Sequence, residues 1–304
     1  MMSDTMDTTS KRCGFIALIG APNAGKSTLM NALVGVKISI VTPKAQTTRS
    51  RVTGVCIEGD AQLIFVDVPG VFHAKQRFEK AMVECAYSGA DEADIVAFMF
   101  DTTRKPSEET EAALKRVSNP QKPLLLILNK IDAISDKAKL LPLIEWFSAR
   151  AQIEEIFMVS ALDNDGVREL KQRFAALVPH GAWHYPDDHL TDMPKRLLAA
   201  EITREQCFFK LRDELPYSLM VETESYEEKR DGSVKINQVI TVQNESQKMI
   251  VLGKSGEMLK KIGVTARSEI ARNFDQTCHL FLFVRVREDW KDKPEHYRTL
   301  GLNY

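Results

Sequence analysis

Short apolar runs alternate with amphipathic stretches along the first 178 residues of the chain. The runs have the length and aliphatic character of buried strands, and they predict strands over residues 14–19, 52–57, 61–67, 95–101, 124–129 and 154–159. Apolar residues at helical spacing predict helices over residues 27–35, 76–89, 107–117, 136–149 and 166–177. This alternation predicts an α/β domain with a mostly parallel sheet, right-handed crossovers and helices on both faces.

The pattern changes at Pro179. Pro, Gly, His and Asp residues are frequent over residues 179–194, which we interpret as a linker. A helical stretch over 195–213 follows, and then two strand-like runs, 217–225 and 233–243, are joined by a segment that contains the hairpin signal Asp-Gly. Two helical stretches and a strand over 280–286 complete an α+β pattern.

These changes of pattern give the domain organisation that we expect. A first domain occupies residues 13–178 and a second occupies 195–289, with the linker at 179–194 between them. Residues 1–12 are polar and predict a disordered N-terminus, and residues 290–304 form a C-terminal tail.

A glycine-rich segment joins the first predicted strand to the first predicted helix. Its residues fit the pattern G-x-x-x-x-G-K-[ST], and they are Gly20, Ala21, Pro22, Asn23, Ala24, Gly25, Lys26 and Ser27. Backbone N–H groups of such a loop, and of the helix that continues through Thr28, can bind phosphates. Lys26 can reach the β- and γ-phosphates of a nucleoside triphosphate, and the Ser27 hydroxyl can bind Mg²⁺.

The third predicted strand ends in a D-x-P-G sequence, which consists of Asp67, Val68, Pro69 and Gly70. A carboxylate at this position can hold Mg²⁺ through water, and the glycine N–H can approach a γ-phosphate. The same four residues taken alone are also typical of an ordinary turn at a strand end.

An N-K-x-D sequence follows the fifth predicted strand and points to guanine. The Asp132 carboxylate can accept two hydrogen bonds from the N1–H and N2–H₂ edge, Asn129 suits the O6/N7 side, and the Lys130 stem can cover the ring. Ser160-Ala161, after the last strand, is the usual place for a backbone N–H that contacts O6. Taken alone, residues 129–132 could also form a helix N-cap region.

The four motifs occur in this order, each at the end of an apolar run, and over residues 13–178 they resemble the GTPase domain of the Era-like, translation-factor-related family. The resemblance implies GTP and GDP as ligands and Mg²⁺ as the cofactor. It also implies a mobile switch segment near residues 44–49, in which Thr48 matches the Thr-Arg pair of the family and would bind Mg²⁺; Thr47 is the alternative. We expect Lys26, Thr48, Asp67 and Gly70 to carry the catalysis.

Two residues bear on the rate of hydrolysis. Val71 stands where Ras-like enzymes have a water-orienting Gln, so we expect slow intrinsic turnover. Asn23 matches the asparagine that helps to hold a monovalent cation in related K⁺-activated GTPases, and our hypothesis is that K⁺ stimulates turnover. The alternative is that Asn23 only stabilises the loop.

Composition narrows the class of protein further. The apolar and charged fractions, 44% and 27%, are those of a soluble globular protein, and no run approaches the length of a transmembrane helix. The five cysteines have no metal-ligand spacing and are interpreted as reduced thiols. The formal net charge is −1, so binding to a nucleic acid requires a local basic patch.

Such a patch accompanies a G-x-x-G loop in the second domain. Residues 250–263 are close to the pattern of KH domains, in which two glycines let the backbone approach about four unstacked nucleotides. Residues 253–287 contain seven Lys and Arg but three Asp and Glu residues. The RNA contacts that we expect are Ile250, Leu252, Gly253, Lys254, Ser255, Gly256, Lys260, Lys261 and Arg267. Ile250, Leu252, Met258 and Ile262 could instead belong mainly to the core.

The hairpin that precedes the loop resembles the type II KH arrangement, and the whole chain over about 290 residues is similar to the Era-like family. The resemblance implies binding of single-stranded RNA near the 3′ end of 16S rRNA and a role in assembly of the 30S ribosomal subunit, with GTP favouring RNA binding and hydrolysis favouring release. It also implies a cytoplasmic protein that can associate peripherally with the inner face of the cell membrane. No feature of the sequence demands a dimer, so we expect a monomer.

Two alternatives stay open at this point. The KH fold of a GTP-dependent switch could contact a protein partner rather than RNA. Alternatively, the chain could be an RNA-binding module whose nucleotide site binds GTP but barely hydrolyses it, an interpretation to which Val71 gives some weight.

Overall fold

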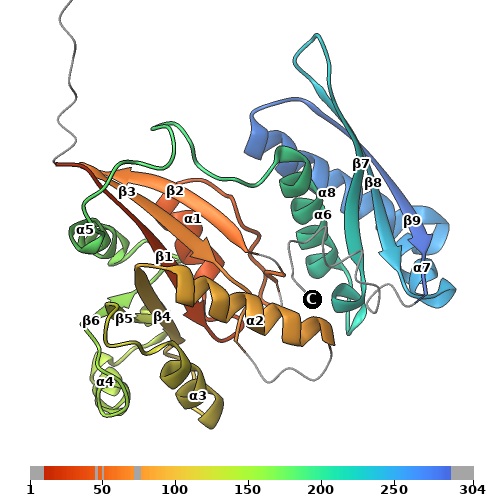
Figure 1. Cartoon of the computed structure of the whole chain (residues 1–304). Coiled ribbons are helices and arrows are strands. Elements are labelled where there is room, and N and C mark those ends of the chain that lie inside the picture. Colours follow the sequence, from red (N-terminus) through yellow and green to blue (C-terminus); the bar gives the residue numbers. More distant parts are fainter. Residues whose placement is uncertain (1–9, 45–46, 50, 72–76, 289–304) are drawn as a thin grey trace, which may run out of the picture. The chain divides into compact units, whose positions relative to one another are not determined.

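The computed structural model describes residues 10–44, 47–49, 51–71 and 77–288 (Figure 1). The expectations for residues 1–9 of the N-terminus and for the tail at 290–304 lie outside these residues. Within the described part, the chain forms two compact units. The first contains the chain up to Ile38 and Thr48–Asp192, and the second contains Ser39–Thr47 and the chain from Met193 onward.

The first unit is built on a six-stranded sheet in the order β2-β3-β1-β4-β5-β6. Its strands are β1 (Arg12–Gly20), β2 (Val52–Glu58), β3 (Ala61–Asp67), β4 (Ile95–Asp101), β5 (Leu124–Asn129) and β6 (Glu155–Val159). Every neighbouring pair is parallel except the hairpin of β2 and β3 at the edge. The predicted, mostly parallel α/β sheet is therefore confirmed.

Helices cover both faces of this sheet. They are α1 (Lys26–Val34), α2 (Arg77–Glu92), α3 (Glu108–Val117), α4 (Leu141–Ser148) and α5 (Val167–Leu177). Residues of α2, α3 and α4 share a core with one side of the strands. Phe174 of α5 packs edge-on against Phe65 on the other side, and α5 also lies against α1.

The helix expected over 136–149 is shorter than predicted. Two short 3₁₀ turns, Ile131–Ala133 and Lys137–Leu140, precede α4, which begins at Leu141 with Pro142 in its first turn. Proline fits the first turn of a helix but removes a hydrogen-bond donor from its interior, so the regular helix starts there.

The expected linker is bonded to the first unit over most of its length. Cys13 N donates to Pro179 O at 3.0 Å, and Gln62 Nε2 donates to Tyr185 O at 2.8 Å. Val55 N donates to Leu190 O at 2.8 Å. Residues 179–192 therefore form an ordered strap along β1, β2 and β3 rather than a free connection.

The second unit is an α+β fold with a three-stranded sheet in the order β7-β8-β9. Its elements are α6 (Lys195–Lys210), a 3₁₀ turn (Leu215–Ser218), β7 (Met220–Glu228), β8 (Val234–Val242), α7 (Glu245–Leu252), α8 (Glu257–Phe274) and β9 (Cys278–Val286). Strands β7 and β8 are antiparallel, whereas β8 and β9 are parallel. Strand β7 starts three residues later than predicted because the 3₁₀ turn occupies the residues before it.

The hairpin and the core of the second unit follow from its sequence. Gly232 adopts a φ of 79° at the predicted Asp-Gly turn, and its N–H donates to Lys229 O at 3.0 Å. Residues of α6, α7 and α8 share one core with the side of β9 that carries Leu282, Val284 and Val286. The segment Ser39–Thr47 also belongs to this unit, where Val41 N donates to Glu205 Oε1 at 2.9 Å.

No helix among the described residues is both long enough and apolar enough to cross a membrane.

Candidate functional site

The glycine-rich loop lies between the end of β1 and the start of α1. Gly25 adopts a φ of 98°, and a Cβ there would lie 2.1 Å from Asn129 Nδ2. A Cβ on Gly20 would lie 2.4 Å from Met99 O. Asn23 also has a positive φ, of 65°. The N-terminus of α1 has no side-chain cap, so the loop and the helix end present backbone N–H groups where an anion can bind.

Lys26 is held inside this loop. Its Nζ donates to Gly20 O at 3.0 Å and to Ala21 O at 3.1 Å, and its side chain is almost completely buried. Burial lowers the pKa of Lys26 to about 8, although the Asp67 carboxylate acts in the opposite direction. A buried ammonium that has only carbonyl partners and one carboxylate nearby is well placed to gain from a phosphate group.

Three oxygen atoms from separate segments meet next to the loop. Ser27 Oγ lies 2.6 Å from Asp67 Oδ2 and 2.9 Å from Thr48 Oγ1, and Thr48 Oγ1 lies 3.2 Å from the same Asp67 oxygen. Two hydroxyls and a carboxylate are the hard ligands that Mg²⁺ prefers, so the donor set fits this ion. Thr47 lies apart from this cluster, because its hydroxyl bonds to Thr42 Oγ1 and Lys44 O.

The D-x-P-G segment runs against the glycine-rich loop. A Cβ on Gly70 would lie 2.7 Å from Pro22 N, so only glycine allows the two backbones to approach this closely. Val71 N donates to Gly20 O at 3.0 Å and fixes the end of the segment. Val68 is fully buried below it.

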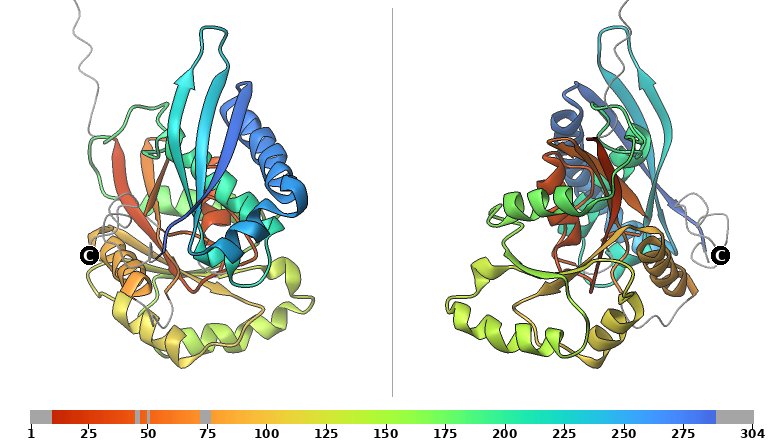
Figure 2. Two further views of the ribbon diagram at one scale, coloured as in Figure 1. Left: turned by 90° about the vertical axis from the view of Figure 1, so that its right-hand side faces the viewer. Right: turned by 60° about the vertical axis from the view of Figure 1, so that its left-hand side comes forward.

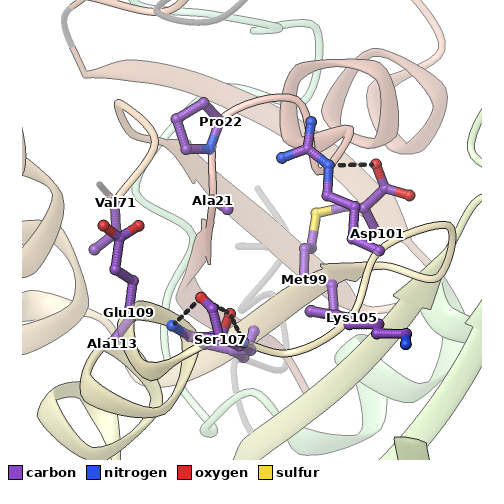
Figure 3. A pocket seen from close by; sticks show the side chains of 13 residues that line it. Ala21, Pro22, Val71, Met99, Asp101, Lys105, Ser107, Glu109 and Ala113 are labelled. Carbon is purple, nitrogen blue, oxygen red and sulfur yellow. Dashed lines mark hydrogen bonds and ion pairs between the residues drawn. The ribbon is translucent and has the colours of Figure 1, made fainter. Parts of the chain in front are cut away.

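A pocket of about 250 Å³ adjoins this junction (Figure 3). Pro22 and Val71 line it together with side chains from the end of β4, the loop that follows and the start of α3, among them Asp101, Arg104 and Glu109. Val71 contributes only methyl groups to this wall, and it cannot orient a water molecule by hydrogen bonding.

Asn129 connects three of the four motifs. Its Nδ2 donates to Ala24 O at 2.8 Å, and its Oδ1 accepts from Ala161 N at 3.0 Å. The amide thus joins two loops, and because it also has a second N–H and a second lone pair, these bonds are compatible with the contact to the O6/N7 side of guanine that the sequence led us to expect. In this structure Asn129 acts as a brace between the loops.

Lys130 has a partner that the sequence analysis missed. Its Nζ lies 2.6 Å from Oδ2 of Asp101, the last residue of β4, and its backbone has a φ of 67°. Burial favours a raised pKa for Asp101, but Lys130 and the hydroxyl and N–H of Thr103 together hold the pKa below its ordinary value. The sequence did contain one indication that Asp101 belongs to the site, because Asp101, like Asp67 and Asn129, ends a predicted strand.

The remaining residues of the base site lie on the adjoining loops. Asp132 is exposed on the 3₁₀ turn after β5. Ser160 is buried, and its Oγ accepts from Asp163 N at 3.2 Å, which shapes the loop that carries Ala161. The structure therefore brings the four nucleotide motifs together at one end of the sheet, where the carboxyl ends of β1, β3, β5 and β6 meet.

The G-x-x-G loop of the second unit joins α7 to α8. Gly253 and Gly256 have φ values of 70° and 80°, and Ser255 between them has 52°. A Cβ on Gly253 would lie 2.7 Å from Met258 Cβ, whereas one on Gly256 would meet nothing within 4 Å. Three positive φ values in four residues turn the backbone outward, and Lys254 and Ser255 are exposed at its tip.

The predicted RNA contacts divide into exposed and buried residues. Ile250 is exposed on α7, as are Lys260, Lys261 and Arg267 on α8. Leu252 is partly buried, and Ile262 is fully buried in the core. The exposed set lies on the two helices that flank the loop.

Models of protein families match both units. The model described as a 50S ribosome-binding GTPase matches residues 15–130, and the KH domain model matches residues 214–291. These matches agree with the fold of each unit.

Relatives match almost the whole chain. GTPase Era of Brucella suis biovar 1 (strain 1330) is 50% identical over 298 residues, which cover 98% of this chain and 96% of the relative. GTPase Era of Mesorhizobium japonicum is 49% identical over 301 residues, with coverages of 99% and 97%.

Two solved structures are similar over the same extent. A crystal structure of Era in complex with MgGDPNP and nucleotides 1506–1542 of 16S ribosomal RNA has a TM-score of 0.91 and 38% identity, and it covers 97% of this chain and 100% of that chain. A variant of Aquifex aeolicus Era bound to GDP and AlF₄⁻ has the same TM-score and identity, with coverages of 96% and 100%.

Proposed function

The chain belongs to the Era family of GTPases, and we propose that it hydrolyses GTP with Mg²⁺ and binds single-stranded RNA near the 3′ end of 16S rRNA in assembly of the 30S subunit. The observation that carries the nucleotide part is the cluster of Ser27, Thr48 and Asp67 oxygens beside the glycine-rich loop. The proposed domain limits remain 13–178 for the GTPase domain and 195–289 for the KH domain.

Phosphate binding and hydrolysis follow from the residues around the loop. The backbone N–H groups of the loop from Gly20 to Thr28, except at Pro22, which has none, hold the phosphates, and Lys26 neutralises their charge. Ser27, Thr48 and Asp67 would hold Mg²⁺, Asp67 through water, and a bound ion would neutralise charge on the phosphates. Gly70 N–H contacts the γ-phosphate, and Thr48 leaves when that group is lost. Because Val71 cannot orient water, intrinsic turnover is slow.

Guanine is selected by the residues after β5 and β6. The Asp132 carboxylate accepts from N1–H and N2–H₂, and a backbone N–H of the Ser160-Ala161 loop donates to O6. The Lys130 stem covers one face of the ring, while Asn129 keeps both loops in position. Adenine presents an acceptor at N1 and would leave the Asp132 charge unpaired, which excludes it.

A monovalent cation at Asn23 would stabilise the negative charge of the phosphates during hydrolysis, as an arginine finger does in other GTPases. The positive φ of Asn23 supports this proposal only indirectly, because it shapes the loop beside the phosphates. We expect faster turnover in K⁺ than in Na⁺ at constant ionic strength. Equal rates in the two salts would remove the cation from the mechanism.

RNA binding is assigned to the loop of the second unit. Positive φ values at both glycines allow the backbone to approach a nucleic-acid strand, and Lys254, Lys260, Lys261 and Arg267 supply charge for phosphates. Ile250 and Leu252 offer apolar contacts to bases. A monomer in the cytoplasm, with peripheral association at the inner face of the membrane, is proposed on the resemblance to the family alone.

The proposal is tested by measuring the affinity for single-stranded RNA copies of the 16S 3′ end, with a GTP analogue, with GDP and without nucleotide. We expect the tightest and most salt-sensitive binding with the GTP analogue, and a loss of about tenfold or more in a Gly253→Asp/Gly256→Asp variant, because two carboxylates would face the RNA backbone. The absence of RNA binding in every state would favour a protein partner. A single-turnover assay that shows no phosphate release, even with RNA and K⁺, would favour a GTP-binding module without hydrolysis.

A further inference from the structure

Strand β9 presents an aromatic row on the face of the sheet that turns away from the helices. Its alternate residues Leu282, Val284 and Val286 pack into the core with α6, α7 and α8. The intervening residues His279, Phe281, Phe283 and Arg285 are all exposed. We call these four residues the β9 outer row. Strand β9 is an edge strand, next to β8, and the left-hand view of Figure 2 shows the three strands side by side.

Two phenylalanines in this row are unusually accessible. Phe281 is 48% exposed and Phe283 is 56% exposed, although burying a phenylalanine side chain is favourable. They are two residues apart on one strand, so their Cα atoms are separated by about 7 Å on the same face. Neither ring contributes to the core clusters of the second unit.

Basic side chains accompany the two rings. Lys235 of β8 pairs in register with His279, and its Nζ lies 5.9 Å from the centre of the Phe281 ring. At the other end of the row, Arg285 forms an ion pair with Glu224 of β7. Neither β8 nor β9 contains an Asp or a Glu, whereas β7 contains four glutamates. The two rings therefore lie on a strand that carries basic but no acidic residues, and the carboxylates of the sheet are on β7, where Glu224 pairs with Arg285 and Glu227 lies opposite Lys235 in the register.

We propose that the β9 outer row is a second RNA-binding surface, on which Phe281 and Phe283 stack against unpaired bases while Lys235 and Arg285 contact the backbone. This inference rests on the proposed function and extends it beyond the G-x-x-G loop. Exposed aromatic side chains on a sheet, with cations beside them, form the stacking platform that single-stranded RNA uses in other folds.

The length of RNA gives a reason for a second surface. A KH groove holds about four nucleotides. The Era structure similar to this chain was obtained with nucleotides 1506–1542 of 16S rRNA, a segment far longer than one groove can hold. An RNA of that length has bases and phosphates beyond those that fill the groove, and the β9 outer row offers rings for bases that are unpaired and positive charge for phosphates.

The chemistry of the row favours RNA over a protein partner. Both of its exposed apolar side chains are aromatic, and the aliphatic residues of β9 alternate with them into the core. Stacking needs only ring faces, and the cations on β8 and β9 complement a polyanion.

The test compares two RNA lengths and three matched variants of the full chain. The short probe is an RNA of about four nucleotides, the length that the G-x-x-G groove holds, and the long probe is an RNA copy of nucleotides 1506–1542. A Phe281→Leu/Phe283→Leu variant keeps apolar volume but removes the rings, and a Phe281→Tyr/Phe283→Tyr variant keeps the rings. Phe209→Leu changes a phenylalanine on α6 that is 55% exposed and serves as the matched control.

We expect the leucine variant to bind the long RNA about ten- to thirtyfold more weakly, because each stacked base contributes substantially to affinity. The same variant should bind the short RNA normally, and the tyrosine variant and Phe209→Leu should bind both RNAs normally. In the wild-type protein, ultraviolet irradiation should cross-link a long RNA that contains 4-thiouridine to the peptide that carries Phe281 and Phe283.

Several outcomes would overturn the proposal. Unchanged binding of the long RNA by the leucine variant would do so, and so would equal losses for the short and long probes, which would indicate a general defect in the unit. Loss of a self-association seen by sedimentation, with RNA binding unaffected, would assign the row to a second copy of the chain. If instead the wild-type protein bound neither RNA, the proposed function itself would fail.

Discussion

The nucleotide site and the G-x-x-G loop both offer protein backbone to phosphate groups. They differ in the burial of the residues around that backbone. Around the nucleotide site the functional side chains bond one another: Lys26 is buried among carbonyl groups, and Asn129 joins two loops. At the G-x-x-G loop the tip is exposed, and the geometry depends on the φ values of Gly253, Ser255 and Gly256.

The two sites are thus held in their binding conformation in different ways, one by hydrogen bonds between side chains and loops and the other by the backbone conformation of the loop. A site for a small ligand of fixed shape gains from side chains locked by their neighbours, because every misplaced atom reduces the affinity. A site for a flexible polymer needs an accessible backbone and charge, and it leaves base contacts to surfaces outside the loop. We therefore expect single substitutions to have larger effects in the first unit.

The largest effect is expected for Asp132→Asn. The amide would place a donor opposite the N2–H₂ group of guanine, and sites that depend on such hydrogen bonds reject mismatched ligands by factors of roughly 10³ or more. We expect weaker GTP binding by that factor and a gain in binding of xanthosine triphosphate, measured by fluorescence competition. Asp136→Asn, which changes an exposed carboxylate nearby, is the control. Unchanged GTP affinity in Asp132→Asn would remove this residue from base recognition.

The same substitution in the two loops tests the comparison directly. In Gly25→Ala the new methyl group would overlap Asn129 Nδ2, and we expect kcat/KM for GTP to fall roughly a hundredfold. In Gly256→Ala the methyl group has free space, but an alanine at this positive φ is strained by about 1 kcal/mol. If the loop relaxes from the conformation that binds RNA, the same free energy lowers the RNA affinity about fivefold. Equal effects in both loops would contradict the distinction.

The pH dependence of GTP binding reports on the burial of Lys26. In the free protein its pKa is lowered to about 8 by burial, and bound phosphates would raise it by favouring the ammonium form. Below pH 8 the affinity should stay constant. From pH 8 to 9 each binding event should take up a proton, and affinity should fall by up to about tenfold per pH unit.

Calorimetry in two buffers of different ionisation enthalpy measures this uptake, and constant affinity up to pH 9 would contradict it. The same shift has a consequence for folding without nucleotide. Between pH 8 and the ordinary value of 10.5, the unfolded chain binds more protons than the folded chain, so this group makes folding more favourable as the pH rises.

The smallest effect on GTP binding is expected for Asp101→Asn. Loss of the carboxylate weakens the hold on Lys130 Nζ, and the Lys130 stem then covers the base less consistently. We expect GTP affinity to fall about fivefold, the size of one weakened charge-assisted hydrogen bond. Asp91→Asn, which breaks an exposed ion pair with Arg116, should leave GTP binding unchanged. If both variants bind GTP equally well, Asp101 has no role in positioning Lys130.

The sequence predicted the strands and the position of the nucleotide motifs well, because buried parallel strands are nearly continuous apolar runs and each motif follows one of them. It missed the start of α4, where Pro142 has more influence than helical periodicity. It also missed the pairing of Asp101 with Lys130, since the distance between the ends of two neighbouring strands depends on the order of strands in the sheet.

Two further features depended on tertiary structure. The polar residues 179–192 resembled a free linker, but their hydrogen bonds go to β1, β2 and β3, which no local pattern reveals. The exposure of Phe281 and Phe283 was equally hidden. Alternating residues on a strand show that two faces exist, but not which face the helices cover.

The bridging amide of Asn129 has a consequence for the rate at which nucleotide leaves. Because one planar group joins the backbone at Ala24 to the backbone at Ala161, the phosphate end and the base end of the site cannot loosen separately. Dissociation should then occur as one cooperative event, with a single exponential phase, and Asn129→Ala should both accelerate release and divide it into separable steps.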